Sequence, residues 1–131
     1  MADILVVDDD PNLGPTLALV LESEGHVVRL ADNGRAGLHA LDERLPDLVV
    51  LDVEMPELDG PGMSHEMLIH DHGREKVPVL LASGIVDLER VAERVGTPYF
   101  IEKPCSLDRL VGAVDRALRE HIPPRAPETK P

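Results

Sequence analysis

The sequence predicts an α/β fold in which a parallel β-sheet is covered by helices on both faces. Short apolar runs of strand length alternate five times with longer segments of helical periodicity, which is the pattern of repeated strand–helix units. The apolar runs are continuous, as expected for parallel strands buried on both faces. The crossovers between such strands are right-handed in nearly all proteins. We expect strands at residues 4–7, 26–31, 48–51, 77–82 and 98–102.

The first two helices are expected between the first three strands. The first begins near Asn12 and ends at Gly25, a residue type that commonly follows the last helical turn. Pro15 must then lie in the first turn, because a proline further inside would remove a helical hydrogen bond. The second helix begins after Asp32 or Asn33, either of which is a favourable N-cap. Its apolar face consists of Leu38, Leu41 and Leu45.

Three further helices complete the pattern. One is expected over residues 60–72, between the third and fourth strands. The next has apolar residues at i, i+3, i+4 and i+7 spacing between Leu88 and Val95, and Gly96 ends it. Ser106 is expected to cap the last helix, whose apolar residues recur with helical spacing to Leu118.

The composition indicates one globular domain. The chain has 131 residues, and 43% of them are hydrophobic, which is enough for a substantial core. We expect this domain to span residues 1–121. Residues 122–131 contain four prolines, which is typical of a disordered tail or the beginning of a linker.

The net charge and the cysteine content limit the classes of binding partner and the cellular compartment that we expect for this protein. The formal net charge is -12, which argues against direct binding of nucleic acid or an anionic membrane, because both require a basic patch. No apolar run has the length of a membrane span, and the N-terminus lacks the features of a signal peptide. The single cysteine, Cys105, cannot form an internal disulfide, so we expect a reduced, cytoplasmic setting.

Polar residues follow four of the five expected strands. Asp8 and Asp9 follow the first strand, Asp52 the third, Ser83 the fourth and Lys103 the fifth. Each residue alone is typical of a turn. In a parallel sheet, however, all carboxyl ends lie at one edge, where open α/β sheets bind their ligands. The sequence therefore predicts a single cleft that contains three carboxylates, a hydroxyl and an ammonium group.

The charges of this cleft indicate its chemistry. Three neighbouring carboxylates repel one another unless a cation joins them, and Lys103 supplies only one positive charge. Carboxylate oxygens with room for water suit Mg²⁺, which can also hold phosphate oxygens. The assembly suits an aspartyl phosphate in which Asp52 is the nucleophile. Mg²⁺ and Lys103 would neutralise the phosphoryl charge, and Ser83 would donate a hydrogen bond to it.

These residues also form a pattern that resembles a known family. An acidic pair follows the first strand, Leu-Asp-x-x-Met-Pro-x-x-Asp-Gly occupies residues 51–60, Ser83 follows the fourth strand, and Lys103-Pro104 follows the fifth. The chain is thereby similar to the receiver domain of bacterial two-component response regulators, from Asp3 to about His121. The resemblance implies a flavodoxin-like (βα)5 three-layer sandwich with the strand order 2-1-3-4-5.

The resemblance also implies a metal site. It gives Asp9 as a direct Mg²⁺ ligand and Asp8 as a ligand through water. Asp52 and the backbone carbonyl of Glu54 complete the expected set.

Four further roles follow from the resemblance. Asp52 is the expected phosphoacceptor, and Lys103 is the counter-ion of the phosphoryl group, joined to Pro104 by a cis peptide bond. Ser83 and Phe100 take the positions of the switch hydroxyl and the switch aromatic. In the family, phosphorylation draws the hydroxyl inward and the aromatic moves with it, which is a population shift driven by the phosphoryl group.

The resemblance implies a signalling module rather than an enzyme, with only self-phosphotransfer and autodephosphorylation expected. A histidine kinase or phosphotransfer protein would donate the phosphoryl group, and an unidentified downstream protein would bind the switched surface. A homodimer through the last two helices and the strand between them is left open.

Two other functions remain as alternatives. A phosphatase of the haloacid-dehalogenase type would use Asp52, Glu54, Ser83 and Lys103 in similar roles. Its acidic pair, however, comes last in the chain, whereas here the pair comes first, and no cap domain is present. A receiver-like module that binds its partner constitutively is the other alternative, although the complete acidic set argues against it.

Three neighbouring residues have simpler interpretations. Asp10 is interpreted as a helix cap rather than a third metal ligand. Cys105 is interpreted as a small packed residue rather than a redox group. Phe100 has core packing as its alternative role. The family usually has threonine at the position of Ser83 and alanine at that of Gly84, and neither difference removes a catalytic group.

Overall fold

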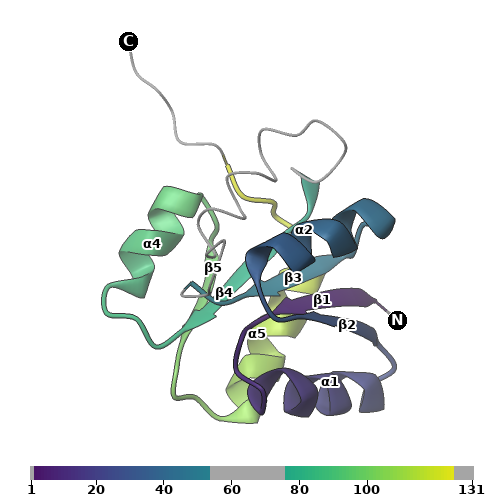
Figure 1. The fold of residues 1–131 in the computed structure, drawn as a ribbon. Coiled ribbons are helices and arrows are strands. Elements are labelled where there is room, and N and C mark those ends of the chain that lie inside the picture. The colour runs from purple at the N-terminus through teal and green to yellow at the C-terminus, as the bar shows by residue number, and fades with distance from the viewer. Residues whose placement is uncertain (1, 54–75, 126–131) are drawn as a thin grey trace.

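A computed structural model describes residues 2–53 and 76–125 of the chain. Its helices and strands are β1 (Asp3–Val7), α1 (Leu13–Ser23), β2 (Val27–Ala31), α2 (Gly34–Glu43), β3 (Leu48–Leu51), β4 (Val79–Ser83), α4 (Leu88–Val95), β5 (Tyr99–Glu102) and α5 (Leu107–Glu120) (Figure 1). The helix expected over 60–72 and the carbonyl of Glu54 lie outside the described residues. No helix in the described part of the chain is long and apolar enough to cross a membrane.

The sheet has five parallel strands in the order β2-β1-β3-β4-β5. This is a flavodoxin-like α/β fold, and it confirms the predicted fold class. The neighbouring strands β1 and β3 pair in register, with Ile4 opposite Leu48 and Val7 opposite Leu51. All four residues of β3 are buried, which explains why the run is continuously apolar.

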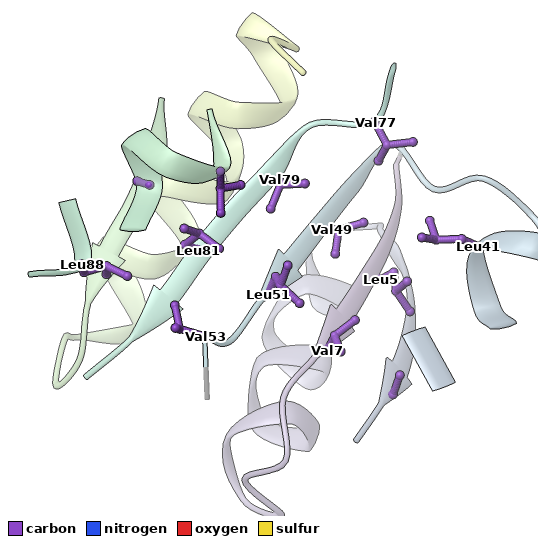
Figure 2. Close-up of a cluster of buried hydrophobic side chains, with 13 residues drawn as sticks. Leu5, Val7, Leu41, Val49, Leu51, Val53, Val77, Val79, Leu81 and Leu88 are labelled. Carbon is purple, nitrogen blue, oxygen red and sulfur yellow. The ribbon is translucent and has the colours of Figure 1, made fainter. Parts of the chain in front are cut away.

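Two apolar layers hold the helices against the sheet. Figure 2 shows the layer on the face that α2 and α4 cover, where Leu41 of α2 and Leu88 of α4 lie at opposite ends of a cluster of strand side chains that includes Leu51. The opposite layer lies under α1 and α5, which contribute Leu17, Leu21, Leu110, Val114 and Ala117. Because successive strand residues point to opposite faces, Val49 and Leu51 belong to one layer and Leu48 and Val50 to the other.

The helix starts agree with the predicted capping residues. Pro15 is the third residue of α1, within the first turn as expected. The side-chain oxygen of Asn33 accepts a hydrogen bond from the backbone N–H of Ala36 at 2.8 Å, and it caps α2. The Ser106 hydroxyl accepts one from the N–H of Arg109 at 3.2 Å, and it caps α5. Each cap satisfies a donor that has no partner within its helix.

The strand boundaries differ slightly from prediction for local reasons. β4 was expected from Val77 but begins at Val79, because Pro78 has no N–H to give to the ladder. The carbonyl of Pro78 still accepts the N–H of Val49 at 3.0 Å, and Val77 is buried. β5 begins at Tyr99, one residue after the expected start at Pro98, for the same reason.

The segment after α5 lies against the domain. The N–H of Ile122 donates to the Tyr99 hydroxyl at 3.2 Å, and the N–H of Arg125 donates to the carbonyl of Gly96 at 3.0 Å. Pro124 between them is buried. These contacts concern residues 122–125 only, and the domain boundary at residue 121 stays a prediction.

Candidate functional site at the carboxyl edge of the sheet

The carboxyl ends of β1, β3, β4 and β5 surround one open cavity of about 600 Å³. Its lining residues are Asp8, Asp9, Asp10, Asp52, Ser83, Gly84, Ile85 and Lys103. The five residues that the sequence placed at strand ends all belong to this set. The strand ladder continues one step beyond the strands and holds them there. The N–H of Asp52 donates to the carbonyl of Val7 at 2.9 Å, and the N–H of Lys103 donates to that of Ser83 at 2.9 Å.

Asp8 is an enclosed carboxylate with two partners in this cavity. Its side chain is 5% exposed, and its Oδ2 accepts a hydrogen bond from Nζ of Lys103 at 2.7 Å. Its Oδ1 accepts the backbone N–H of Asp10 at 2.9 Å. A buried carboxylate requires such partners because an unpaired buried charge is costly. The ammonium group of Lys103 is therefore committed to Asp8 in this state of the protein.

The surroundings of Asp52 have opposing effects on the pKa of its carboxyl group. Burial raises the pKa of its carboxyl group above the usual value, and the charge of Asp8 raises it further. Lys103, the N–H of Val53 and the Ser83 hydroxyl oppose this shift without cancelling it. The Val53 N–H donates to Oδ1 of Asp52 at 2.8 Å. Asp52 is thus a carboxylate that would gain from a cation nearby.

Three carboxylates are arranged so that one metal ion could bind them all. Asp8, Asp9 and Asp52 each offer an oxygen, and these oxygens lie within 4.8 Å of one another. Oxygen donors of this charge suit a hard divalent cation such as Mg²⁺, and Asp9 is exposed, which leaves room for bound water. The donor set is consistent with a metal site.

A second cluster in the described residues, Glu24, His26 and Asp115, has a different character. Nδ1 of His26 accepts the backbone N–H of Ala2 at 3.1 Å. When one ring nitrogen of a histidine binds a metal, the other ring nitrogen normally carries the proton and donates a hydrogen bond. Nδ1 of His26 accepts a hydrogen bond instead. We therefore assign no metal to this cluster.

The two predicted switch residues lie at different depths. Ser83 is 3% exposed, and its hydroxyl accepts the backbone N–H of Ile85 at 3.3 Å. Phe100 is 37% exposed and is paired in register with Leu81. The alternative that Phe100 is a core residue is therefore wrong. The core aromatic of β5 is its neighbour Tyr99, which is 2% exposed and points to the face that α5 covers.

The residues next to the three carboxylates have structural contacts of their own. Oδ1 of Asp10 accepts the N–H groups of Asn12 at 2.9 Å and of Leu13 at 3.4 Å, and these bonds lower the pKa of its carboxyl group. Asp10 therefore supports the turn that leads into α1, whereas the N-cap residue itself is Asn12. Cys105 is partly buried against the α1–α5 layer, as expected of a small packed residue. The peptide bond from Lys103 to Pro104 is cis, as the resemblance implied.

The sequence reasoning missed Ile85 as a lining residue of the cavity. Its side chain also packs against the α2–α4 layer, so it links the cavity to the start of α4. Its position two residues after a strand-end serine was the available signal.

Comparison with known proteins identifies what this arrangement is similar to. A family model described as "Response regulator receiver domain" matches residues 4–115. Regulatory protein AtoC of Escherichia coli is 36% identical over 88% of this chain, and transcriptional regulatory protein FixJ of Bradyrhizobium diazoefficiens is 34% identical over 92%. The crystal structure of the receiver domain of NtrX from Brucella abortus has a TM-score of 0.79 at 38% identity, and covers 89% of this chain and 98% of that one.

The match to the longer relatives is partial. The chain covers 25% of AtoC and 58% of FixJ. It spans about a quarter of the length of the first curated relatives that it matches.

Proposed function

Because the chain belongs to the response regulator receiver domain family, we propose that it accepts a phosphoryl group on Asp52 in a Mg²⁺-dependent reaction. The donor is a histidine kinase or a phosphotransfer protein of a two-component system. The observation that carries this proposal is the meeting of Asp52, two further carboxylates, Lys103 and Ser83 in one open cavity. The chemistry of that donor set suits an anion that is bound through a metal ion and an ammonium group.

In the proposed reaction a carboxylate oxygen of Asp52 attacks the phosphorus of a phosphohistidine. The new O–P bond forms as the P–N bond breaks, and the departing imidazole takes up a proton from water. Asp8, Asp9 and Asp52 would hold Mg²⁺, with the backbone carbonyl of Glu54 as a further ligand. The ion supplies positive charge that favours the ionised form of Asp52 and offsets the charge of the phosphoryl group.

Lys103 and Ser83 have distinct tasks in this proposal. The ammonium group of Lys103 binds Asp8 before the reaction, and a phosphoryl group on Asp52 would compete for it. The Ser83 hydroxyl accepts a hydrogen bond from Ile85, and its own proton can be donated to a phosphoryl oxygen. Movement of Ser83 would alter the loop that leads to α4. The exposed side chain of Phe100 could then change position, and the surface of α4, β5 and α5 would change its affinity for a downstream protein.

Intact-mass spectrometry after incubation with acetyl phosphate and Mg²⁺ tests the proposal. The wild type should gain one phosphoryl adduct, and Asp52→Asn should gain none. Asp10→Asn is the matched control, because Asp10 lines the same cavity but its carboxylate serves the backbone of α1. It should be labelled like the wild type. Omission of Mg²⁺ should abolish labelling in every variant.

Two results would contradict the proposal. Failure to label the wild type, when calorimetry shows that Mg²⁺ binds, would favour a receiver-like module that binds its partner constitutively. Steady release of phosphate from p-nitrophenyl phosphate, with turnover that requires Asp52, would favour the phosphatase alternative.

A further inference from the structure

The segment after α5 changes direction sharply at His121. His121 has a φ of 54° and a ψ of 47°, and its N–H donates to the carbonyl of Ala117 at 2.9 Å. A non-glycine residue in this left-handed conformation costs free energy, and it persists only where surrounding contacts hold it. The chain therefore does not continue along the axis of α5. It crosses to α4 through residues 122–125, which we call the strap.

The strap is held at both of its ends. At one end the N–H of Ile122 donates to the hydroxyl of Tyr99, a β5 residue that is 2% exposed. At the other end the N–H of Arg125 donates to the carbonyl of Gly96 at 3.0 Å. Pro124, between these two hydrogen bonds, is buried. The strap thus connects the end of α5 with the end of α4 across the beginning of β5.

Gly96 is shaped to receive the strap. It ends α4 in a left-handed conformation with a φ of 84°, and its N–H donates to the carbonyl of Ala92 at 2.8 Å. A Cβ atom at this position would lie 2.8 Å from the backbone nitrogen and carbon of Arg125, and closer still to its carbonyl oxygen. Two separate constraints therefore require glycine at residue 96: the left-handed backbone and the close approach of the strap. At residue 25 only the left-handed backbone, with a φ of 94°, requires glycine, because no atom lies within 4 Å of the place that a Cβ would take there.

The opposite end of α4 is held more weakly. Its N-cap residue, Asp87, has a φ of 62° and makes no side-chain capping hydrogen bond. Val86 before it is 83% exposed. This end leads directly back to Ile85 and Gly84, which line the acidic cavity. One end of α4 is therefore fastened by the strap, whereas the other end, beside the cavity, has no side-chain cap.

We propose that the strap is a restraint that pins the C-terminal end of α4 to α5 and β5, so that α4 moves by its N-terminal end. The helix then acts as a lever whose free end lies at the cavity and whose pivot lies at Gly96. This arrangement does not depend on phosphorylation of Asp52, because every contact that carries it lies at the opposite edge of the sheet from the acidic cluster.

Hydrogen exchange in the full 131-residue chain tests the pivot. Arg125→Pro removes the N–H that donates to Gly96, whereas Arg125→Ala retains it and serves as the matched control. Arg125→Pro should accelerate amide exchange several-fold in residues 91–97 relative to Arg125→Ala, with a much smaller change in residues 84–90. Equal exchange in the two variants would overturn the proposal.

A pair of glycine substitutions gives an independent measurement. Gly96→Ala and Gly25→Ala place the same side chain in similar left-handed conformations, but only the first meets the strap. The urea midpoint should fall further for Gly96→Ala. Combining Gly96→Ala with Arg125→Pro should cost less than the sum of the two, because both displace the same segment. Equal midpoints for the two glycine variants would overturn the proposal. If Gly96→Ala fails to fold, the two Arg125 variants still decide.

Discussion

Replacement of Asp9 by asparagine should stabilise the metal-free protein. Asp9 faces two other carboxylates, Asp8 and Asp52, with oxygens of the three groups within 4.8 Å of one another. Lys103 is bound to Asp8 and supplies one positive charge against the three carboxylates, so Asp9 adds repulsion with both of its neighbours. Asp9→Asn removes this repulsion and leaves the Lys103–Asp8 ion pair intact.

The size of the effect can be worked from the distance and the exposure. Two unit charges 4.8 Å apart repel by about 0.9 kcal/mol in water and by about 3.5 kcal/mol at an effective dielectric constant of about 20. Asp9 is exposed, so the lower figure applies. We expect the free energy of unfolding to rise by about 1 kcal/mol at low salt. The gain should shrink in about 1 M salt, where the screening length is about 3 Å.

Urea unfolding measured by circular dichroism reports this change, first in EDTA and then in MgCl₂. Mg²⁺ should raise the melting temperature of the wild type, because it binds the folded cavity and not the unfolded chain. Asp9→Asn has lost a ligand and should gain less from Mg²⁺, so the order of the two proteins should reverse. Asp10→Ala is the control and should lose stability in EDTA, because it removes the oxygen that accepts the N–H groups of Asn12 and Leu13. A loss of stability for Asp9→Asn in EDTA would refute the reasoning, as would equal stabilisation of both proteins by Mg²⁺.

Three further predictions concern single residues. The pKa of Asp52 is raised in the folded state, so its contribution to stability is present below its unfolded pKa and is lost as pH rises through the folded pKa. Asp52→Asn lacks this contribution. Between about pH 4 and pH 7 in EDTA, the urea midpoint should therefore decline less for Asp52→Asn than for the wild type. Gly84→Ala should raise the free energy of unfolding by about 0.4–1 kcal/mol in urea titrations, because its Cβ would lie an ordinary 3.6 Å from the Lys103 carbonyl and the unfolded chain loses freedom; a lowered urea midpoint would exclude this fit. Arg29→Lys should lower the free energy of unfolding by about 1–3 kcal/mol, because Arg29 donates at 2.7 Å to the carbonyls of both Ala40 and Arg44 and a lysine cannot reach both. An unchanged urea midpoint would show that these two hydrogen bonds of the guanidinium group contribute nothing.

The sequence pattern was sufficient for the strands of a parallel sheet and for most of the residues that line the cavity, whereas the strand order was implied by the family resemblance. Continuous apolar runs such as Leu48–Leu51 belong to parallel strands that are covered on both faces. All strands of a parallel sheet end at one edge, so the residue after each apolar run must lie at that edge. For this reason Asp52, Ser83 and Lys103 could be grouped without coordinates, although they are far apart in the chain.

The partners of these side chains could not be predicted in the same way. Strand ends fix where a backbone finishes, whereas the length and rotamer of a side chain determine what it reaches. Lys103 extends across the cavity to Asp8, and the Ser83 hydroxyl accepts the N–H of Ile85. Phe100 likewise alternates with the buried residues Tyr99 and Ile101 along β5, and its exposure follows from the face of the sheet to which it points.

Residues 122–125 show most clearly what could not be predicted from the sequence. Their prolines are typical of a disordered tail, yet Pro124 is buried and Arg125 binds Gly96. The sequence determined the strands, their polar ends and the family pattern, because each of these arises from local apolar periodicity and from the chemistry of a few residues. The tertiary structure alone decided which charge Lys103 neutralises and where the chain runs after α5, because both depend on contacts between segments that only the folded chain brings together.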